Sequence, residues 1–378
     1  MDHRLTEEQQ AIIDMAERFT ADEISPNAAD WDETHTYPRE TIRKAGELGF
    51  GAVYLDEAHG GIGLGRLEAV LIMEAMAYGC PSTSALISIH NMATWMIARF
   101  GDEALGKRFL PQLTSLEQMA SYCLTEPSAG SDAASLKTRA VRDGDHYVLN
   151  GAKAFISGAG ENEIYVCMVR TGAEGHGGIS CLVVEKDTPG VSFGANERKL
   201  GWHSQPTAMV TFDDARVPVA NLVGKEGDGF KIAMAGLDGG RLNIGACSLG
   251  GAQRCLDEAI GYVKERKQFG RSIAEFQNTQ FMLADMATDL EAARALLRIA
   301  ALKVTEDAAD KTRFAAMAKL HSTDAGFRVA NDALQLHGGY GYLMDYPIER
   351  FLRDLRVHQI LEGTNQVMRM IIGRDLLA

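Results

Sequence analysis

The sequence predicts an α+β chain in three parts: an N-terminal all-helical domain (1–119), a middle antiparallel β-barrel or sandwich domain (120–226) and a C-terminal helix bundle (227–378). Three observations predict this division. Apolar residues recur at helical spacing in the first third, short β-prone runs fill the middle, and a long apolar stripe runs through the last third. A chain of 378 residues also fits two or three domains.

The N-terminal third begins with a helix start signal. Thr6 and Gln9 form a T-x-x-Q capping box, and Ile12, Met15 and Phe19 follow at helical spacing. Further helical patterns cover Thr41–Leu48, Leu67–Tyr78, Ser84–Phe100 and Glu103–Leu113. We therefore expect the first domain to consist of helices.

The middle part contains a candidate β-hairpin. His146–Leu149 and Ala154–Ile156 flank Asn150-Gly151, a dipeptide typical of a type I′ turn. Other short β-prone runs are bounded by Gly, Pro and Asp and cover Ile164–Val169, Ile179–Val184 and Met209–Phe212. These features predict a small antiparallel barrel or sandwich.

The C-terminal part carries a stripe of apolar residues at alternating steps of three and four. A stripe of this kind is typical of a helix buried in a bundle, and it is more often core than a cofactor site. The residues of the stripe are Leu283, Met286, Leu290, Ala293, Leu297, Ala300 and Val304.

Composition excludes some classes of protein. Hydrophobic residues make up 46% of the chain, which is enough for a large core, and the net charge of −13 disfavours a nucleic-acid-binding protein. The six cysteines include no C-x-x-C pair, so we expect reduced thiols. The ten histidines do not cluster, and we assign no metal.

No targeting or membrane segment is expected. The segment Met1–Glu8 is acidic and lacks an apolar region, and no apolar run is long enough to span a bilayer. We therefore expect no membrane association and a cytoplasmic location, or the mitochondrial matrix if a transit peptide has been removed.

One carboxylate near the C-terminus is a candidate catalytic base. Glu362 follows Ile360 and Leu361 and precedes Gly363, a setting in which loss of water would raise its pKa toward neutrality. Upstream, Gly338 and Gly339 lack a Cβ, so the backbone there can approach a ligand closely. A buried glutamate paired with Arg369 is the alternative interpretation.

Five motifs in a fixed order resemble the acyl-CoA dehydrogenase family over essentially the whole chain. They are T-E-P-x-x-G-S-D from Thr125, N-G-x-K-x-F-I-S from Asn150, R-K-x-F-G from Arg266, Q-x-H-G-G from Gln335 and L-E-G-T-N-Q from Leu361. Any one of them alone is weak, and the spacing of the first on its own favours a surface turn over a functional segment. The resemblance implies the three domains above with a C-terminal four-helix bundle, non-covalent FAD and a homotetramer.

The resemblance also implies a cofactor site. Leu124 and Thr125 would meet the flavin ring and Ser157 would lie near its N5 and O4 atoms, while Arg266 would hold the pyrophosphate across a subunit boundary. The full implied set is Tyr122, Leu124, Thr125, Ser131, Phe155, Ile156, Ser157, Arg266, Phe269, Phe276, Gln277, Gln335, Gly338, Gly339, Thr364 and Gln366.

For the substrate, the resemblance implies that Asp238, Arg241 and Arg374 line a CoA channel and that Ser131 contacts the pantetheine or the cofactor phosphates. A surface ion pair is the alternative for each arginine. Glu362 would remove the α-proton of the acyl-CoA while the β-hydride moves to flavin N5. Some family members carry the base at the position of Gly240, and a glycine cannot serve there.

Within the family, the segments Gly201–Thr207, Gly236–Leu249 and His337–Gln359 resemble the branch that oxidises isobutyryl-CoA to methacrylyl-CoA in valine degradation. Leu361 stands where members acting on straight chains usually carry tyrosine. Electron-transfer flavoprotein is the implied electron acceptor. The alternatives are another short or 2-methyl-branched acyl-CoA, a non-catalytic flavin-binding member and an acyl-CoA oxidase.

Overall fold

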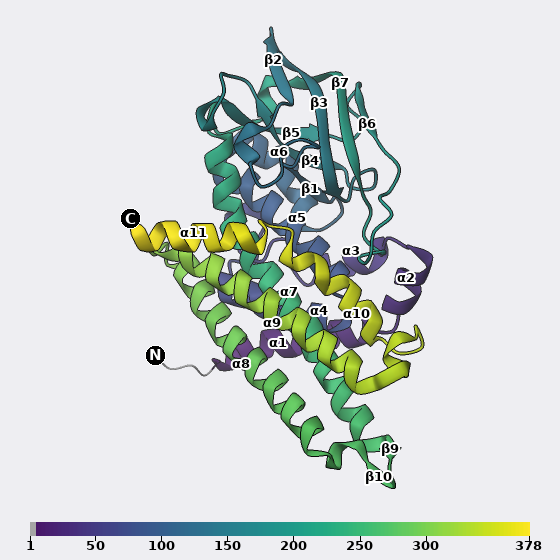
Figure 1. Cartoon of the computed structure of the whole chain (residues 1–378). Coiled ribbons are helices and arrows are strands. Elements are labelled where there is room, and N and C mark those ends of the chain that lie inside the picture. The colour runs from purple at the N-terminus through teal and green to yellow at the C-terminus, as the bar shows by residue number, and fades with distance from the viewer. Residues whose placement is uncertain (1–4) are drawn as a thin grey trace.

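The structure is a computed structural model that describes residues 5–378. Residues 1–4, which open the acidic N-terminal segment considered above, lie outside the described residues. The β domain forms the upper part of the molecule in Figure 1, and the helices of the C-terminal bundle extend away from it. The predicted order of helical domain, β domain and helix bundle is confirmed.

The N-terminal domain is helical, as predicted. Its first helix begins with the expected capping box, in which Thr6 Oγ1 accepts a hydrogen bond from Gln9 N and Gln9 Oε1 accepts one from Thr6 N, both at 3.1 Å. Its elements are α1 (Glu7–Phe19), η1 (Thr20–Ile24), α2 (Ala28–Thr34), α3 (Arg39–Glu47), η2 (Glu57–His59), α4 (Arg66–Gly79), α5 (Pro81–Phe100) and α6 (Glu103–Thr114).

The middle domain is built on one sheet in the order β6-β7-β3-β2-β4-β5-β8, with β1 paired to β4. Most pairs are antiparallel, but β1 and β2 each run parallel to β4. Its elements are β1 (Ala120–Cys123), η3 (Ala133–Ser135), β2 (Arg139–Asp143), β3 (His146–Ser157), β4 (Ile164–Arg170), η4 (His176–Gly178), β5 (Ile179–Glu185), β6 (Val191–Phe193), β7 (Thr207–Pro218), η5 (Val219–Asn221) and β8 (Leu222–Val223).

The hairpin predicted at Asn150-Gly151 is wrong. These residues lie inside the continuous strand β3, at a register shift in its pairing with β7. Asn150 Oδ1 accepts a hydrogen bond from Asp214 N at 3.0 Å, and the backbone of Gly151, with φ of 143°, passes close to Thr138. The dipeptide therefore forms a β-bulge, and the hairpin turn lies earlier, where Asp143 pairs with His146.

The C-terminal part is a bundle whose long helices are α7, α8 and α9. The predicted apolar stripe lies on α8, and its five central residues are fully buried. The elements are α7 (Gly229–Glu265), β9 (Lys267–Gln268), β10 (Arg271–Ser272), η6 (Ile273–Glu275), α8 (Gln277–Thr305), α9 (Lys311–His337), η7 (Gly338–Tyr342), α10 (Ile348–Arg356), η8 (Val357–Gln359) and α11 (Asn365–Leu377).

Helix α7 joins the parts of the molecule because it packs against α4, α5, α8 and α9. The contact with α4 is close, since a Cβ on Gly250 would lie 2.0 Å from the carbonyl oxygen of Glu74. One apolar core consequently runs through the N-terminal helices and the bundle without a break. Among the described residues, no helix is long and apolar enough to cross a membrane.

Candidate active site

Glu362 lies in the short link between η8 and α11. Its φ is 55°, in the left-handed region that non-glycine residues rarely adopt, and Gly363 follows with φ of 88°. Such a conformation costs about 1–3 kcal/mol and is often found at functional sites. The Thr364 hydroxyl ends the link because it accepts a hydrogen bond from Val367 N at 3.2 Å and caps α11. Thr364 therefore has a structural use in addition to its predicted cofactor contact.

The carboxylate of Glu362 lies against α7 at Gly240. A Cβ on Gly240 would be 2.7 Å from Glu362 Oε2 and 2.9 Å from the sulfur of Met92. A side chain at position 240 and the side chain of Glu362, the two positions at which the family resemblance implies a base, would therefore occupy the same space. A side chain at position 240 would displace Glu362, so the glycine and the glutamate are compatible as a pair.

Burial raises the pKa of Glu362 to about 7, and the cations of Arg241 and Lys319 oppose this rise. Its Oε2 atom is shielded from solvent and has no hydrogen-bond partner among residues 5–378. Arg369, the alternative partner, instead binds Asp324 at 3.2 Å and the carbonyl oxygen of Asn365 at 3.1 Å. The carboxyl group is therefore able to exchange a proton near neutral pH.

Arg66 lies beside this site and was missed from the sequence. Its guanidinium stacks over the ring of Tyr54, 3.5 Å from the ring centre, and lies 5.0 Å from the centre of the Trp95 ring. A Cβ on Gly239 would be 2.1 Å from Arg66 Nη1. Arg66 is 7% exposed, and within the described chain its Nη1 has no hydrogen-bond partner. Burial lowers the pKa of this arginine.

Two further polar groups near Glu362 are shielded without partners in the part of the chain that the structure describes. They are the hydroxyl of Tyr54 and the side-chain amide of Asn243. The charge of Glu362 contributes to the raised pKa of Tyr54, after burial as the main cause, which places the two groups near each other. The signal that sequence reasoning could have used is weak, because isolated polar residues in helices are usually exposed.

Asp238 and Arg241 form a buried ion pair of 2.8 Å on α7, and Asp238 also accepts a hydrogen bond from the Thr312 hydroxyl at 2.7 Å. Arg374 is exposed on α11. Its neighbour Asp375 pairs with Arg313, next to Thr312, at 2.7 Å. The three residues predicted to line a CoA channel thus belong to the same region of the molecule.

The predicted flavin-ring segment is fixed by a buried ion pair between two of the motifs. Lys153 Nζ lies 2.7 Å from Glu126 Oε1 and donates to the carbonyl oxygen of Leu124 at 3.2 Å. Both oxygens of Glu126 also accept backbone N–H groups, from Lys137 at 2.6 Å and Thr138 at 2.9 Å. Burial alone would raise the pKa of Glu126, but Lys153 and these hydrogen bonds lower it.

Residues of this segment differ in exposure. Ile156 is buried, whereas Phe155 is 67% exposed, with φ of 57° at a register shift in the pairing of β3 with β7. Ser157 accepts a hydrogen bond at its carbonyl oxygen from the Ser121 hydroxyl at 2.7 Å. The remaining predicted residues are half-buried Tyr122 and Thr125, buried Leu124 and exposed Ser131.

Tyr122 connects this segment to the base. Burial raises its pKa, and the carboxylate of Glu362 is the second cause. Its hydroxyl is shielded and lacks a partner in residues 5–378. The strand β1 and the Glu362 link, which are far apart in the sequence, therefore face one another.

A second group of predicted cofactor residues lies around a cavity of about 400 Å³, lined among others by Arg266, Gln335, Gly338 and Gly339. The Arg266 guanidinium lies 5.3 Å from the centre of the Tyr340 ring. A Cβ on either glycine would meet no atom within 4 Å, so a ligand has room against this backbone. An exposed arginine beside open backbone fits a pyrophosphate.

Two aromatic residues belong to the same end of the bundle. Phe269 is 94% exposed at the tip of the β9–β10 hairpin, with φ of 52°, and its ring lies 6.2 Å from that of Phe276. Gln277 begins α8 next to Phe276, and Gln366, in the first turn of α11, is also exposed. Figure 1 shows the β9–β10 hairpin at the end of α7 and α8 that is remote from the β domain.

One chain therefore does not bring all predicted cofactor residues together. The group around Arg266 and the group around Glu362 and Ser157 belong to separate regions of the bundle and β domain. The residues present fit FAD. The open backbone at Gly338 and Gly339 and the guanidinium of Arg266 suit its phosphates. The exposed ring of Phe155 and the Tyr122 hydroxyl, which has no partner among the described residues, suit its flavin ring.

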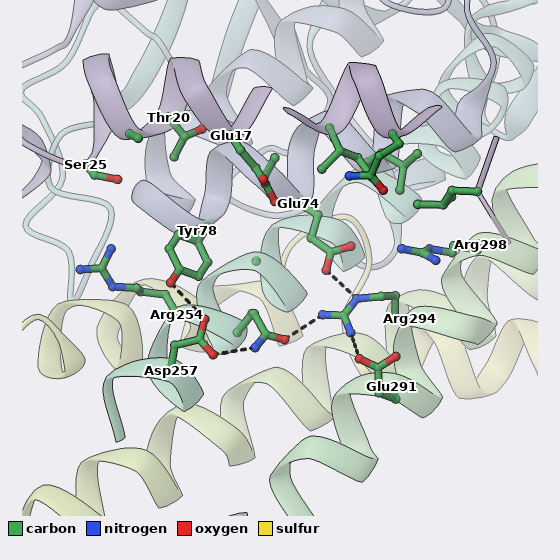
Figure 2. A pocket seen from close by; sticks show the side chains of 18 residues that line it. Glu17, Thr20, Ser25, Glu74, Tyr78, Arg254, Asp257, Glu291, Arg294 and Arg298 are labelled. Carbon is green, nitrogen blue, oxygen red and sulfur yellow. Dashed lines mark hydrogen bonds and ion pairs between the residues drawn. The ribbon is translucent and has the colours of Figure 1, made fainter. Parts of the chain in front are cut away.

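Another cavity, of about 880 Å³, lies elsewhere, between α1, α4, α7 and α8. Figure 2 shows its charged side chains facing one another, with Arg294 bound to Glu74 at 2.8 Å and close to Glu291. None of the predicted site residues lines it. Within residues 5–378, no group of three His, Cys, Asp or Glu residues is arranged to hold a metal ion.

Comparison with known families agrees with the fold and the site. The acyl-CoA dehydrogenase N-terminal domain matches residues 6–117, the middle domain residues 121–215 and the C-terminal domain residues 227–377. The chain belongs to the acyl-CoA dehydrogenase family, whose members are FAD-dependent oxidoreductases. The resemblance inferred from five motifs is confirmed.

Two relatives share more than half of their residues with this chain. The mitochondrial isobutyryl-CoA dehydrogenase of Dictyostelium discoideum is 58% identical over 98% of this chain and 90% of the relative. The mitochondrial isobutyryl-CoA dehydrogenase of Bos taurus is 56% identical over 99% of this chain and 90% of the relative.

Solved structures are similar over the whole length. Butyryl-CoA dehydrogenase from Megasphaera elsdenii is 38% identical, with a TM-score of 0.97 over 100% of both chains. A structure described as an electron transferring flavoprotein of Acidaminococcus fermentans is 44% identical, with a TM-score of 0.98 over 100% of both chains. PigA with FAD and proline is 29% identical, with a TM-score of 0.96 over 100% of this chain and 99% of that one.

Proposed function

We propose that this acyl-CoA dehydrogenase oxidises short branched acyl-CoA thioesters, with isobutyryl-CoA as its preferred substrate and methacrylyl-CoA as product, in valine degradation. The observation that carries the proposal is the identity of 56–58% with isobutyryl-CoA dehydrogenases over nearly the whole chain. Leu361 next to the base is consistent with it. An enzyme acting on another short or 2-methyl-branched acyl-CoA is the second candidate.

Glu362 is the catalytic base in this proposal. Its carboxylate accepts the α-proton of the thioester, and its pKa of about 7 makes it a stronger base than an exposed glutamate. When bound, FAD supplies the acceptor for the hydride that leaves the β-carbon. The close approach of the Glu362 carboxylate to Gly240 supports this role because it limits the positions that the carboxylate can occupy.

Three further expectations belong to the proposal. Electron-transfer flavoprotein is the electron acceptor, which the similar structure described as an electron transferring flavoprotein of A. fermentans supports. The enzyme is a homotetramer whose FAD is shared between subunits, since exposed Phe269 and Arg266 need a partner surface to meet the Glu362 region. The location is cytoplasmic, or mitochondrial after removal of a transit peptide.

An anaerobic titration tests the substrate. The purified flavoprotein is mixed with isobutyryl-, 2-methylbutyryl-, butyryl- and octanoyl-CoA, and flavin absorbance is followed with time. We expect isobutyryl-CoA to reduce the flavin at least about tenfold more efficiently than octanoyl-CoA. Faster reduction by octanoyl-CoA would exclude the short-chain assignment, and a flavin that no acyl-CoA reduces would indicate a non-catalytic flavin-binding protein.

A further inference from the structure

A fully buried lysine anchors the link that carries Glu362. Lys319, on α9, is 0% exposed. Its ammonium donates to the carbonyl oxygen of Gly363 at 2.8 Å and to Oδ1 of Asn365 at 2.8 Å. Gly363 is the residue directly after Glu362, and Asn365 begins α11. One side chain therefore holds both ends of the turn that follows the glutamate.

The turn needs such an anchor because its backbone is strained. Glu362 has φ of 55°, a conformation that costs about 1–3 kcal/mol unless the surrounding structure enforces it. Asn365 is fixed in turn, because its amide donates to the Thr323 hydroxyl at 2.9 Å and to Asp324 at 2.7 Å. Lys319, Thr323 and Asp324 all lie on α9, so this helix holds the turn through several bonds.

Lys319 also places a positive charge in the protein interior. A buried ammonium group is costly unless a nearby negative charge compensates it, so the position of Lys319 beside the Glu362–Gly363 turn needs an explanation. Burial lowers the pKa of Lys319 to about 7, and the carboxylate of Glu362 is the main influence that opposes this. Conversely, the Lys319 cation opposes the effect of burial on Glu362. Each group stabilises the ionised form of the other.

We propose that Lys319 is a positioning residue for the catalytic base: it holds the Glu362–Gly363 turn in its strained conformation, and its positive charge favours the ionised form of Glu362. The inference rests on Glu362 being the base of the proposed function. Other ionisable groups interact electrostatically with Lys319 or Glu362 and come from the elements around them. They are Arg241 on α7, Tyr54 before α4, Tyr122 on β1, Asp324 on α9 and His358 on η8.

These neighbours do not replace Lys319. Arg241 opposes the rise of the Glu362 pKa more strongly than Lys319 does, but it is paired with Asp238 at 2.8 Å and lies on α7 rather than at the turn. Burial lowers the pKa of His358 to about 3, so this histidine is neutral at pH 7. Burial raises the pKa of both tyrosines, which are therefore uncharged at pH 7. Loss of the lysine should consequently raise the pKa of Glu362 further.

Two variants separate charge from geometry. Lys319→Gln removes the charge but can still donate a hydrogen bond to the turn, whereas Lys319→Met removes both. Lys311→Met is the matched control, because Lys311 lies on the same helix and binds Asp307 rather than the turn. The measurement is the rate of anaerobic flavin reduction by isobutyryl-CoA between pH 5.5 and 9 (roughly the range around a pKa near 7), with bound FAD quantified in each preparation.

A base that must be ionised gives a rate that rises with pH through its pKa. We expect both Lys319 variants to move the midpoint upward by about one pH unit or more, and Lys319→Met also to lower the rate at high pH. The control should match the wild type. An unchanged midpoint in Lys319→Gln overturns the proposal, as does loss of FAD from both variants. A wild-type flavin that no acyl-CoA reduces refutes the proposed function instead.

Discussion

At the scale of single residues, the candidate active site combines Gly240 on α7 with Glu362. The carboxylate occupies the volume that a side chain on α7 would need, since a Cβ at position 240 would lie 2.7 Å from Glu362 Oε2. If Glu362 is the base, as we propose, this geometry leaves no room for a second side chain at position 240. The glycine then contributes to the proposed site although it has no chemistry of its own.

Replacement of this glycine should impair catalysis while leaving the fold intact. Gly240→Ala would push the Glu362 carboxylate away from its position, and displacements of about 1 Å can lower rates about 100-fold. We expect flavin reduction by isobutyryl-CoA to slow by about 10- to 100-fold, with normal FAD content. Stopped-flow absorbance under anaerobic conditions measures this rate.

The control for that variant is Gly261→Ala on the same helix, where a Cβ would meet no atom within 4 Å. This variant should keep the wild-type rate and gain slight stability, because alanine favours a helix over glycine by up to about 1 kcal/mol. Equal rates in Gly240→Ala and Gly261→Ala would show that the packing against Glu362 is unimportant.

Some residue-level features could be predicted from the sequence and others could not. The setting of Glu362 between aliphatic residues and glycine correctly predicted a raised pKa. Arg66 and Lys319 were missed because their burial depends on partners far along the chain, such as Gly239 for Arg66 and Gly363 for Lys319. Local sequence does not reveal which charged side chain a distant backbone will cover.

At the scale of elements, the ion pair of Lys153 and Glu126 ties β3 to the turn after β1. Two motifs identified separately in the sequence are in fact joined by this contact, across 27 positions of the chain. The pair holds the Leu124 carbonyl, and Ala154 N donates to the Thr125 carbonyl oxygen at 2.9 Å. The backbone expected to meet the flavin is therefore fixed from inside the β domain.

Breaking this pair should destabilise the β domain. Lys153→Met leaves Glu126 as a buried charge without its partner, which typically costs about 3–5 kcal/mol. Urea unfolding should show a lower midpoint, and the purified variant should retain less FAD. Because Glu126 titrates below its ordinary range in the folded state, its contribution is present at neutral pH and is lost as the pH falls through its lowered pKa.

The double variant Lys153→Met/Glu126→Gln supplies the internal control. It removes the unpaired charge, so we expect it to recover part of the lost stability. If Lys153→Met alone unfolds at the wild-type urea concentration, the pair does not stabilise the domain.

The error at Asn150-Gly151 is also an effect at the scale of elements. The dipeptide has the composition of a type I′ turn, but strand β7 pairs along both sides of it and converts the local irregularity into a bulge. Long-range pairing overrides a local turn signal in this case. By contrast, the stripe on α8 was predicted correctly because it repeats through seven residues, from Leu283 to Val304, and does not depend on one of them.

At the scale of the whole molecule, helix α7 organises the enzyme. It carries Asp238, Gly240 and Arg241 at the site near the β domain, and it ends directly before Arg266, which lines the remote cavity. The order of the domains could be predicted from periodicity, since each part has its own spacing of apolar residues. The separation of the predicted cofactor residues into two groups could not, because it depends on how distant parts of the chain are arranged in the fold.

The central claim is that Glu362 is the base, and the most direct test is anaerobic flavin reduction in Glu362→Gln. Glutamine has nearly the same shape but cannot accept the α-proton, so the variant should bind FAD and isobutyryl-CoA normally and reduce its flavin at least about 1,000-fold more slowly than the wild type. Reduction at a rate near that of the wild type, in a preparation with full FAD content, would contradict the account.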